Sequence, residues 1–299
     1  MGMMTVGFDA GAWGVVGTVV VLLVAYFVVI PLIVASKFWL AAEPIIVPLG
    51  RPEPGIPPTL PMPPPRVECF FRLVEEELVA AGFRPVAWFE LRQSAANTGM
   101  HFAVLHNAAT GDQAAAMVSV GHVSQGIDLT HYVVEFATET ADRCSWNTVN
   151  ARNAEGLPAA AWRTTWRFPG MSDLRMMYEV HRSLLQLEDL PRARAGLPAD
   201  IVEDMRASMI RTYVDLEQRG YLCLDAHGAR YKVRLRGIPF MIVGQMWPIK
   251  TLRCWRMRRR ARALLVRLGH SARYPCEDFG KRITKRLADA PPMARGIAS

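Results

Sequence analysis

An arginine-rich segment near the C-terminus is the clearest set of residues that could bind a charged ligand. Residues 250–286 contain thirteen Lys and Arg and two acidic residues, a net charge of +11, so the rest of the chain carries −3 of the total +8. Guanidinium groups donate paired hydrogen bonds to phosphate, which suits anionic lipid headgroups and nucleic acid alike. We predict polyanion contact at Arg253, Arg256, Arg258, Arg259, Arg260 and Arg262.

These arginines alternate with apolar residues at helical spacing. The apolar stripe is Cys254, Met257, Ala261, Leu264, Leu265 and Leu268, and Gly269 would end the helix. The uncharged residues 237–249 come directly before it. An apolar segment joined to a basic amphipathic helix is typical of a helix that lies in the headgroup plane, with Trp247 and Trp255 at the membrane interface. The alternatives are a helix packed on the body with its arginines in solvent, and a nucleic-acid site.

Histidines of the central region offer a second and weaker site. His131 and Glu135 are four residues apart in a predicted strand and therefore share a face. Histidines of neighbouring strands could join them in a metal or acid–base site; these are His101, His106 and His122. The alternative is that all are ordinary sheet-surface residues.

Motifs of common cofactor and catalytic sites are absent from the sequence. It has no G-x-x-x-x-G-K-[ST], no G-x-G-x-x-G, no H-E-x-x-H and no C-x-x-C. Residues 121–126 are one residue too long for a G-x-S-x-G nucleophile elbow, so Ser124 is not expected to be catalytic. We expect no cofactor or metal, and an enzymatic activity is less favoured than a binding role.

The element that must position these residues is an apolar N-terminal segment. The 27 residues between Asp9 and Lys37 carry no charge, and about 20 apolar residues span a bilayer core of roughly 30 Å as a helix. No Lys or Arg precedes the segment, and the apolar run is too long for a cleaved signal peptide. We predict a transmembrane anchor with Trp13 and Trp39 at its interfaces.

The flanking charges predict the orientation of this anchor. Lys37, Arg51 and Arg66 follow it, and cytoplasmic flanks are enriched in Lys and Arg. We therefore expect the N-terminus outside the cell membrane and the rest of the chain in the cytoplasm. Five widely spaced cysteines agree with a reducing compartment.

A proline-rich linker follows the anchor. Residues 44–65 contain ten prolines, which remove backbone donors and favour extended polyproline II. We expect a semi-rigid spacer that holds the next domain away from the bilayer or lies along the domain surface, and a ligand for an SH3-like partner is an alternative.

Residues 66–190 alternate between helical and strand patterns. Val67, Phe70, Phe71, Val74 and Leu78 form a helical stripe, and strands with period-two alternation follow up to residue 168. A second helix has Leu174, Met177, Tyr178, His181, Leu184 and Leu185 on one face, which places His181 in the core. Short connections favour an antiparallel meander with the flanking helices packed on one face.

A helix at residues 200–219 and a hairpin at 220–235 come next. Together they resemble the last helix and wing of winged helix-turn-helix domains over about 40 residues, which implies DNA binding.

We therefore predict an α+β protein with a single transmembrane helix. The predicted segments are a tail (1–9), the anchor (10–40), the linker (41–65), a meander domain (66–190), a helix–hairpin unit with the basic helix (191–290) and a tail (291–299). The leading hypothesis is a membrane-anchored binding or scaffold protein whose partners are the lipid bilayer and a protein. The alternatives are a membrane-tethered DNA-binding regulator and an enzyme that uses the sheet histidines. The sequence does not determine the oligomeric state.

Overall fold

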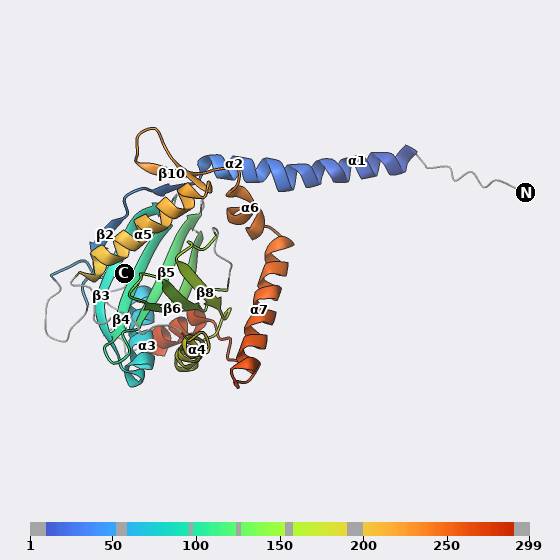
Figure 1. Ribbon diagram of the computed structural model, residues 1–299. Helices are drawn as coiled ribbons and strands as arrows, with labels where there is room; N and C mark the ends of the chain where they lie inside the picture. Colours follow the sequence, from blue (N-terminus) through green and yellow to red (C-terminus); the bar gives the residue numbers. More distant parts are fainter. Residues whose placement is uncertain are drawn as a thin grey trace, which may run out of the picture.

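A ten-stranded sheet organises the chain (Figure 1), and its strand order is β8-β7-β6-β5-β4-β3-β1-β10-β9, with β2 paired to β3. The computed structural model describes residues 10–51, 59–95, 98–123, 127–152, 158–189 and 200–289. The strands are β1 (Trp39–Ala41), β2 (Ile45–Pro48), β3 (Phe83–Ala95), β4 (Thr98–Asn107), β5 (Gln113–Val123), β6 (Ile127–Glu139), β7 (Ser145–Val149), β8 (Arg163–Arg167), β9 (Leu222–Leu224) and β10 (Arg230–Val233).

Eight α-helices accompany the strands in the part of the chain that the structure describes. They are α1 (Ala10–Val24), α2 (Ile30–Lys37), α3 (Pro65–Leu78), α4 (Leu174–Leu187), α5 (Ile201–Gln218), α6 (Ile238–Met241), α7 (Ile249–Arg267) and α8 (Phe279–Asp289). A π-helical turn, Ala25–Val29, joins α1 to α2. The chain is therefore mixed α+β, as the sequence predicts.

The predicted meander is present in strands β3 to β7. Each pairs antiparallel with the next, in registers such as Ala116↔Val134 between β5 and β6. Strand β8 differs, because it pairs parallel to β7 from Ser145↔Arg163 to Val149↔Arg167. A parallel neighbour needs a crossover of about a dozen residues, which the chain between Val149 and Arg163 supplies.

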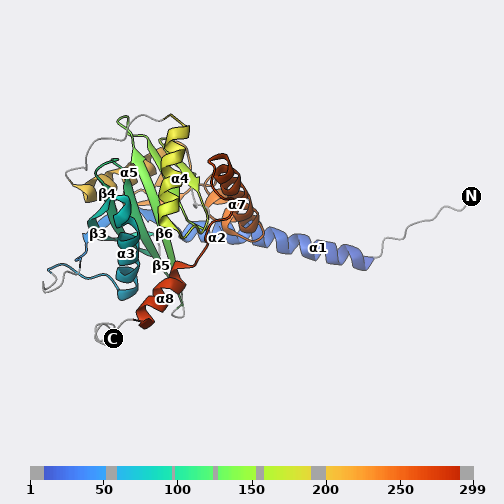
Figure 2. The ribbon, with the colours of Figure 1, turned by 90° about the horizontal axis from the view of Figure 1, so that it is seen from below.

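Helices cover both faces of the sheet. The two helices that flank the meander, α3 and α4, pack on one face as expected, whereas α5 from the later unit covers the other face. Helices α3, α4 and α8 contribute to the larger core on one face, which Figure 2 views from the side of α3 and α4. Helix α5 packs on the opposite face, with Ile201, Met205 and Met209 against Phe89 and Phe102. The residues of β4 explain this, since the run from His101 to Asn107 is buried at every position rather than at alternate ones.

Helix α3 uses the predicted stripe as its buried face. Phe70, Phe71, Val74 and Leu78 are fully buried, and each such side chain contributes about 1.5–3 kcal/mol relative to an exposed one. Gly82 ends this segment in the left-handed region at φ 87°, where a residue without Cβ meets no steric cost.

The C-terminal helix α8 belongs to the same core. Phe279 and Ile283 are buried in the core cluster of α3, and the ring of Phe279 lies 5.4 Å from that of Phe70. Two ion pairs, Arg286–Glu76 and Arg282–Glu77, join the exposed sides of the two helices. Helix α8, which belongs to the predicted 191–290 unit, thus packs into the same core as the predicted 66–190 domain. The boundaries of the predicted domains stay predictions.

The hairpin β9–β10 forms one edge of the main sheet. Strand β10 pairs with β1 from Trp39↔Lys232 to Ala41↔Arg230, and its other side pairs with β9. The element that resembles a wing in the sequence is therefore a continuation of the sheet.

The proline-rich linker is not a free spacer at its start. Ile45–Pro48 forms β2, which pairs with β3, and Ile46 and Leu49 are buried. The Gly50 N–H donates to the Pro61 carbonyl at 2.8 Å, so these two parts of the linker lie next to each other. For Ile45–Pro48 the expected free polyproline II spacer is wrong, because their apolar side chains find partners on the sheet; the alternative, a segment that lies along the domain, agrees with this pairing. Residues 52–58 lie outside the described residues.

The apolar N-terminal segment is helical, as predicted. Val15–Lys37 is long and apolar enough to cross a membrane. Its side chains are mostly exposed, but Pro31 and Ala35 are buried where α2 contacts β10 and α6. Only Phe38 separates α2 from β1, so the helix runs directly into the sheet.

We expect Ile283→Ala to lower the free energy of unfolding by about 2–5 kcal/mol, because it leaves a cavity between α8 and α3. Urea unfolding of the full chain in nanodiscs measures this. Lys281→Ala, on the exposed side of the same helix, is the matched control and should change stability by less than about 0.5 kcal/mol. Equal effects of the two substitutions would show that α8 does not pack on the core.

Candidate functional site

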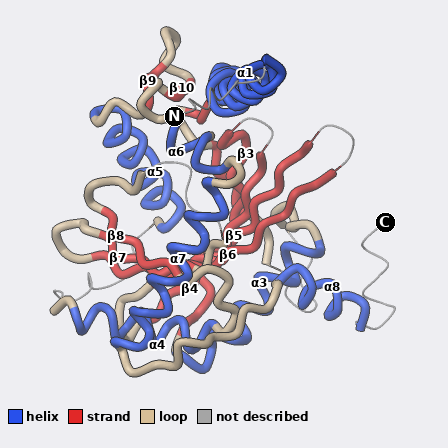
Figure 3. The backbone as a smooth tube through the Cα atoms, turned by 90° about the vertical axis from the view of Figure 1, so that its right-hand side faces the viewer, coloured by secondary structure: helices blue, strands red, loops and turns tan. Residues whose placement is uncertain are grey.

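The arginine-rich helix α7 lies across the end of the domain from which α1 leaves. Figure 3 looks onto this end, with α1 seen along its axis and α7 running in front of the sheet, and Figure 1 shows the same arrangement from the side. Helix α6 and the turn Val243–Gln245 connect α7 to the hairpin, and α6 contacts α2. We call the surface formed by α6 and α7 the basic face.

The inner side of α7 belongs to the protein core. Ala261 and Leu265 are buried, and Leu264 and Leu268 pack against the same cluster. These positions match the predicted apolar stripe. The core contact fixes which side of α7 turns outward.

The outer side of α7 combines apolar residues with arginines. Leu252, Trp255 and Val266 are 51%, 56% and 60% exposed, and Trp247 just before the helix is 72% exposed. The Arg259 guanidinium lies 5.7 Å from the centre of the Trp255 ring. Large apolar side chains exposed together usually mark an interaction surface.

The six predicted arginines fall into two groups on this helix. Arg256, Arg258, Arg259, Arg260 and Arg262 are exposed. Arg253 is half-buried and its guanidinium is 3.4 Å from the Phe240 carbonyl, to which it donates. Within the described ranges, none of the six has an acidic side chain at ion-pair distance. Their charge is therefore not neutralised by neighbouring described residues.

A groove of about 870 Å³ runs between α7 and β8. Five arginines line it: Arg167, Arg253, Arg256, Arg260 and Arg267. Thr165 also lines the groove, and its buried hydroxyl has no hydrogen-bond partner among the described residues. Several guanidinium groups in one groove create a positive potential, which suits a phosphate or another anion.

The predicted interfacial tryptophans lie in different places. Trp247 and Trp255 belong to the basic face, whereas Trp39 begins β1 and stacks with the guanidinium of Arg230 at 4.4 Å. The side chain of Trp13 lies outside the described residues.

The sheet histidines do not assemble around Glu135. His101 lies on the α3 side of β4, since it alternates with Phe102 on the α5 side, and burial lowers its pKa. Glu135 lies on the α5 side, where it forms an ion pair with Arg163 and accepts from the Asn147 amide. His106 is buried near the end of β4, which lowers its pKa, His131 is exposed, and the side chain of His122 is not described. No group of three metal-ligating side chains occurs in the described part of the chain.

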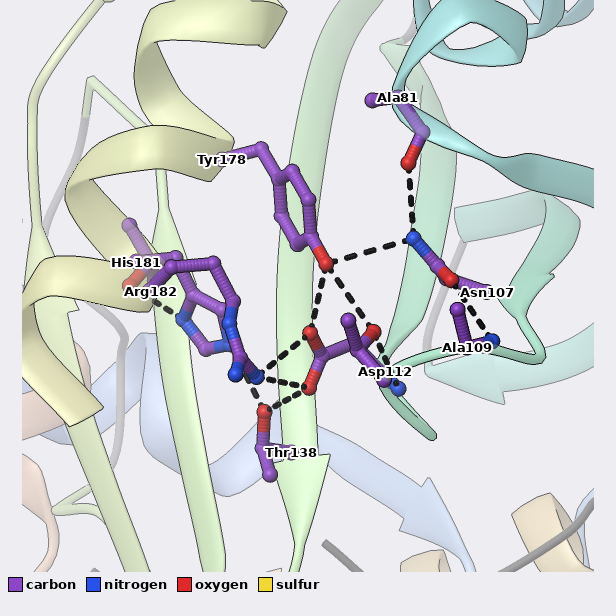
Figure 4. A network of polar contacts seen from close by, with 10 residues as sticks. Ala81, Asn107, Ala109, Asp112, Thr138, Tyr178, His181 and Arg182 are labelled. Atoms are coloured by element: carbon purple, nitrogen blue, oxygen red, sulfur yellow. Dashed lines mark hydrogen bonds and ion pairs between the residues drawn. The ribbon is translucent and has the colours of Figure 1, made fainter. Parts of the chain in front are cut away.

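A buried polar network that motif analysis does not detect joins α4 to the sheet (Figure 4). Asp112 is fully buried and accepts from the hydroxyls of Thr138 at 2.6 Å and Tyr178 at 2.8 Å. Arg182 donates to the same carboxylate at 3.0 Å, and forms an ion pair with it. No local sequence pattern marks Asp112, because its partners Thr138, Tyr178 and Arg182 come from distant segments.

His181 occupies the centre of this network and is buried, as predicted. Its Nε2 lies 2.9 Å from Thr138 and its Nδ1 lies 2.9 Å from Thr148. Since the Thr138 hydroxyl donates to Asp112, it accepts from Nε2–H of His181. Burial lowers the pKa of His181 to about 4, so the imidazole is neutral at pH 7 and its Nδ1 accepts from the Thr148 hydroxyl. Every group has a partner in the core, so the network is suited to fixing α4 on the sheet.

No protein-family model, no curated protein and no solved structure matches this chain.

We expect the free energy of unfolding to fall as the pH drops from about 6.5 toward 4. The unfolded chain takes up a proton at His181 near its ordinary value of 6.5, whereas the folded chain resists it until about 4. Nearby charged and titratable groups are Asp112, Tyr178 and Arg182. Above pH 6.5, His181 is neutral in both the folded and the unfolded chain, so its titration does not lower stability there. Below pH 6.5, its protonation in the unfolded chain lowers the free energy of unfolding by about 3 kcal/mol at most.

Urea unfolding across this pH range, compared with His181→Gln, measures the effect. The variant should be less stable at pH 7 but should show a flatter pH dependence. Parallel pH profiles for the two proteins would contradict a neutral buried histidine.

Proposed function

We propose that this protein is a single-pass membrane protein that holds an α+β binding or scaffold domain directly against the bilayer, where the basic face docks on anionic lipid headgroups. The observation that carries the proposal is the position of α7, which lies across the end of the domain from which the apolar helix leaves. A bilayer around Val15–Lys37 would face this end of the domain.

The short connection between α2 and β1 supports close approach to the membrane. Phe38 is the single residue between them, and Pro31 and Ala35 pack where α2 contacts the domain. The domain therefore has little freedom to rotate away from the end of the helix, which keeps the local lipid concentration high for α7.

The residues on the outer side of α7 suit the headgroup region. Leu252, Trp255 and Val266 can enter the apolar boundary, while adjacent arginines contact phosphate. Anionic lipid attracts such a surface by about 1 kcal/mol for each nearby Lys or Arg. Lys37 at the end of the span and the basic face favour the cytoplasmic side for the domain.

The proposal favours binding over catalysis for the domain. The acidic member of the predicted acid–base site, Glu135, is engaged by Arg163 and Asn147. Strand alternation places His101 on the opposite face of the sheet.

Full-length protein should remain in the membrane pellet after alkaline carbonate extraction, because about 20 apolar residues stabilise the inserted helix. Leu22→Arg with Leu23→Arg should release a large fraction, since each arginine at the centre of a span costs about 2.5–3.5 kcal/mol. Arg substitutions at Leu252 and Val266 are the matched control and should not release the protein. Complete extraction of the wild-type chain would contradict the anchor.

Fluorescence from position 255 should report docking of the basic face. The five native cysteines are replaced by serine and Trp255 by a cysteine that carries an NBD fluorophore, in full-length protein reconstituted into nanodiscs. We expect a blue shift when phosphatidylglycerol is added to zwitterionic lipid, and a smaller shift at high salt. Gln substitutions at Arg256, Arg259, Arg260 and Arg262 should remove most of the shift.

The matched control removes the same charge elsewhere, with Gln at Arg84, Arg92, Arg175 and Arg206, and should leave the shift unchanged. If the NBD emission does not shift with anionic lipid but shifts when duplex DNA is added, the result supports the nucleic-acid hypothesis. A spectrum that responds to neither would leave α7 as a packed helix with solvated arginines and end the docking proposal.

A further inference from the structure

A second cavity lies between α5 and the face of the sheet opposite α3. Its volume is about 320 Å³, within the range of small-molecule sites, and it shares no lining residue with the arginine groove. Phe102, Val104 and Met117 line it from the sheet, and Met205 and Met209 line it from α5. Methionine side chains are flexible and polarisable, so such a wall adapts well to an alkyl chain.

Polar side chains gather at the β6–β8 end of this cavity. Glu135 is engaged by Arg163 and Asn147, and the side-chain amide oxygen of Asn147 accepts from the Ser145 hydroxyl. The lining carboxylates Glu139 and Asp204 also have interactions of their own. The acceptors at this end are thus already engaged.

Two donors at the same end lack a partner among the described residues. They are the buried indole Nε1–H of Trp162 and the buried Nε–H of Arg211, and both residues line the cavity. The Arg211 guanidinium lies 3.7 Å from the centre of the Trp162 ring, and one of its amino groups donates to the Arg143 carbonyl at 3.1 Å. This stacking fixes the cation beside the indole N–H.

We propose that this cavity binds a medium-chain carboxylic acid. The alkyl chain lies on the methionine-rich wall, and the carboxylate accepts from Arg211 and Trp162. A charged acceptor is favoured over a hydroxyl because a guanidinium with a buried, unpartnered Nε–H and a buried indole N–H are both best satisfied by an anion. An amine is disfavoured because the carboxylates nearby already have partners. The site does not depend on membrane docking, since its residues belong to α5 and the sheet.

Binding of decanoate, decanol and decylamine to full-length protein in nanodiscs tests this proposal, with empty nanodiscs as the reference for lipid partitioning. We expect saturable binding of decanoate, and weaker binding of the other two by isothermal titration. Arg211→Gln removes a charge-assisted hydrogen bond and should weaken decanoate binding about ten- to a hundredfold, with little effect on decanol.

Arg206→Gln is the matched control, since Arg206 is on the same helix but does not line the cavity, and it should leave decanoate binding unchanged. Ala115→Leu, which adds bulk to the cavity floor, should block binding, and circular dichroism checks that the variant folds. Decanoate binding no stronger than that of decanol or decylamine, or equal binding by wild type and Arg211→Gln, would overturn the proposal.

Discussion

The backbone pairing of β1 is the constraint on which the arrangement of this protein depends. Three residues, Trp39–Ala41, pair with β10 on one side, and Leu40 pairs with Ala95 of β3 on the other. Leu40 also packs with Leu216, Tyr221 and Tyr231 in a cluster between the hairpin and α5. Because β1 follows the apolar helix after a single residue, these hydrogen bonds fix the direction in which that helix leaves the domain.

The same arrangement places the basic helix α7 at the end of the domain from which the apolar helix leaves. An arginine-rich helix in isolation would expose its charges in any direction, but the burial of Ala261 and Leu265 orients α7 on the domain. The same contact turns Leu252, Trp255 and the arginines away from the core. Charge, exposed apolar area and the exit of the apolar helix thus coincide at one end of the molecule, and this coincidence is the basis on which we propose a membrane surface as the partner of α7.

The two faces of the sheet carry different chemistry. The α3–α4 face is packed with aromatic and aliphatic side chains around the network of Asp112 and His181. The α5 face is covered by a single helix over a small cavity lined with methionines. Close packing makes the α3–α4 side rigid, and the cavity beneath α5 is where we propose that a ligand binds.

The sequence by itself determined the elements whose signals are local. The apolar span is a continuous uncharged run, long enough by itself to predict a helix that could cross a bilayer. The buried stripe of α3, the meander strands and the stripe of α7 are periodic patterns, and each follows from how one helix or strand buries its own side chains. Only the tertiary structure decided that Ile45–Pro48 joins the sheet, that β8 pairs in parallel, that α5 covers the second face and that Asp112 meets His181. These features depend on pairings between distant residues, and no local periodicity encodes which partner a strand edge or a buried polar group will find.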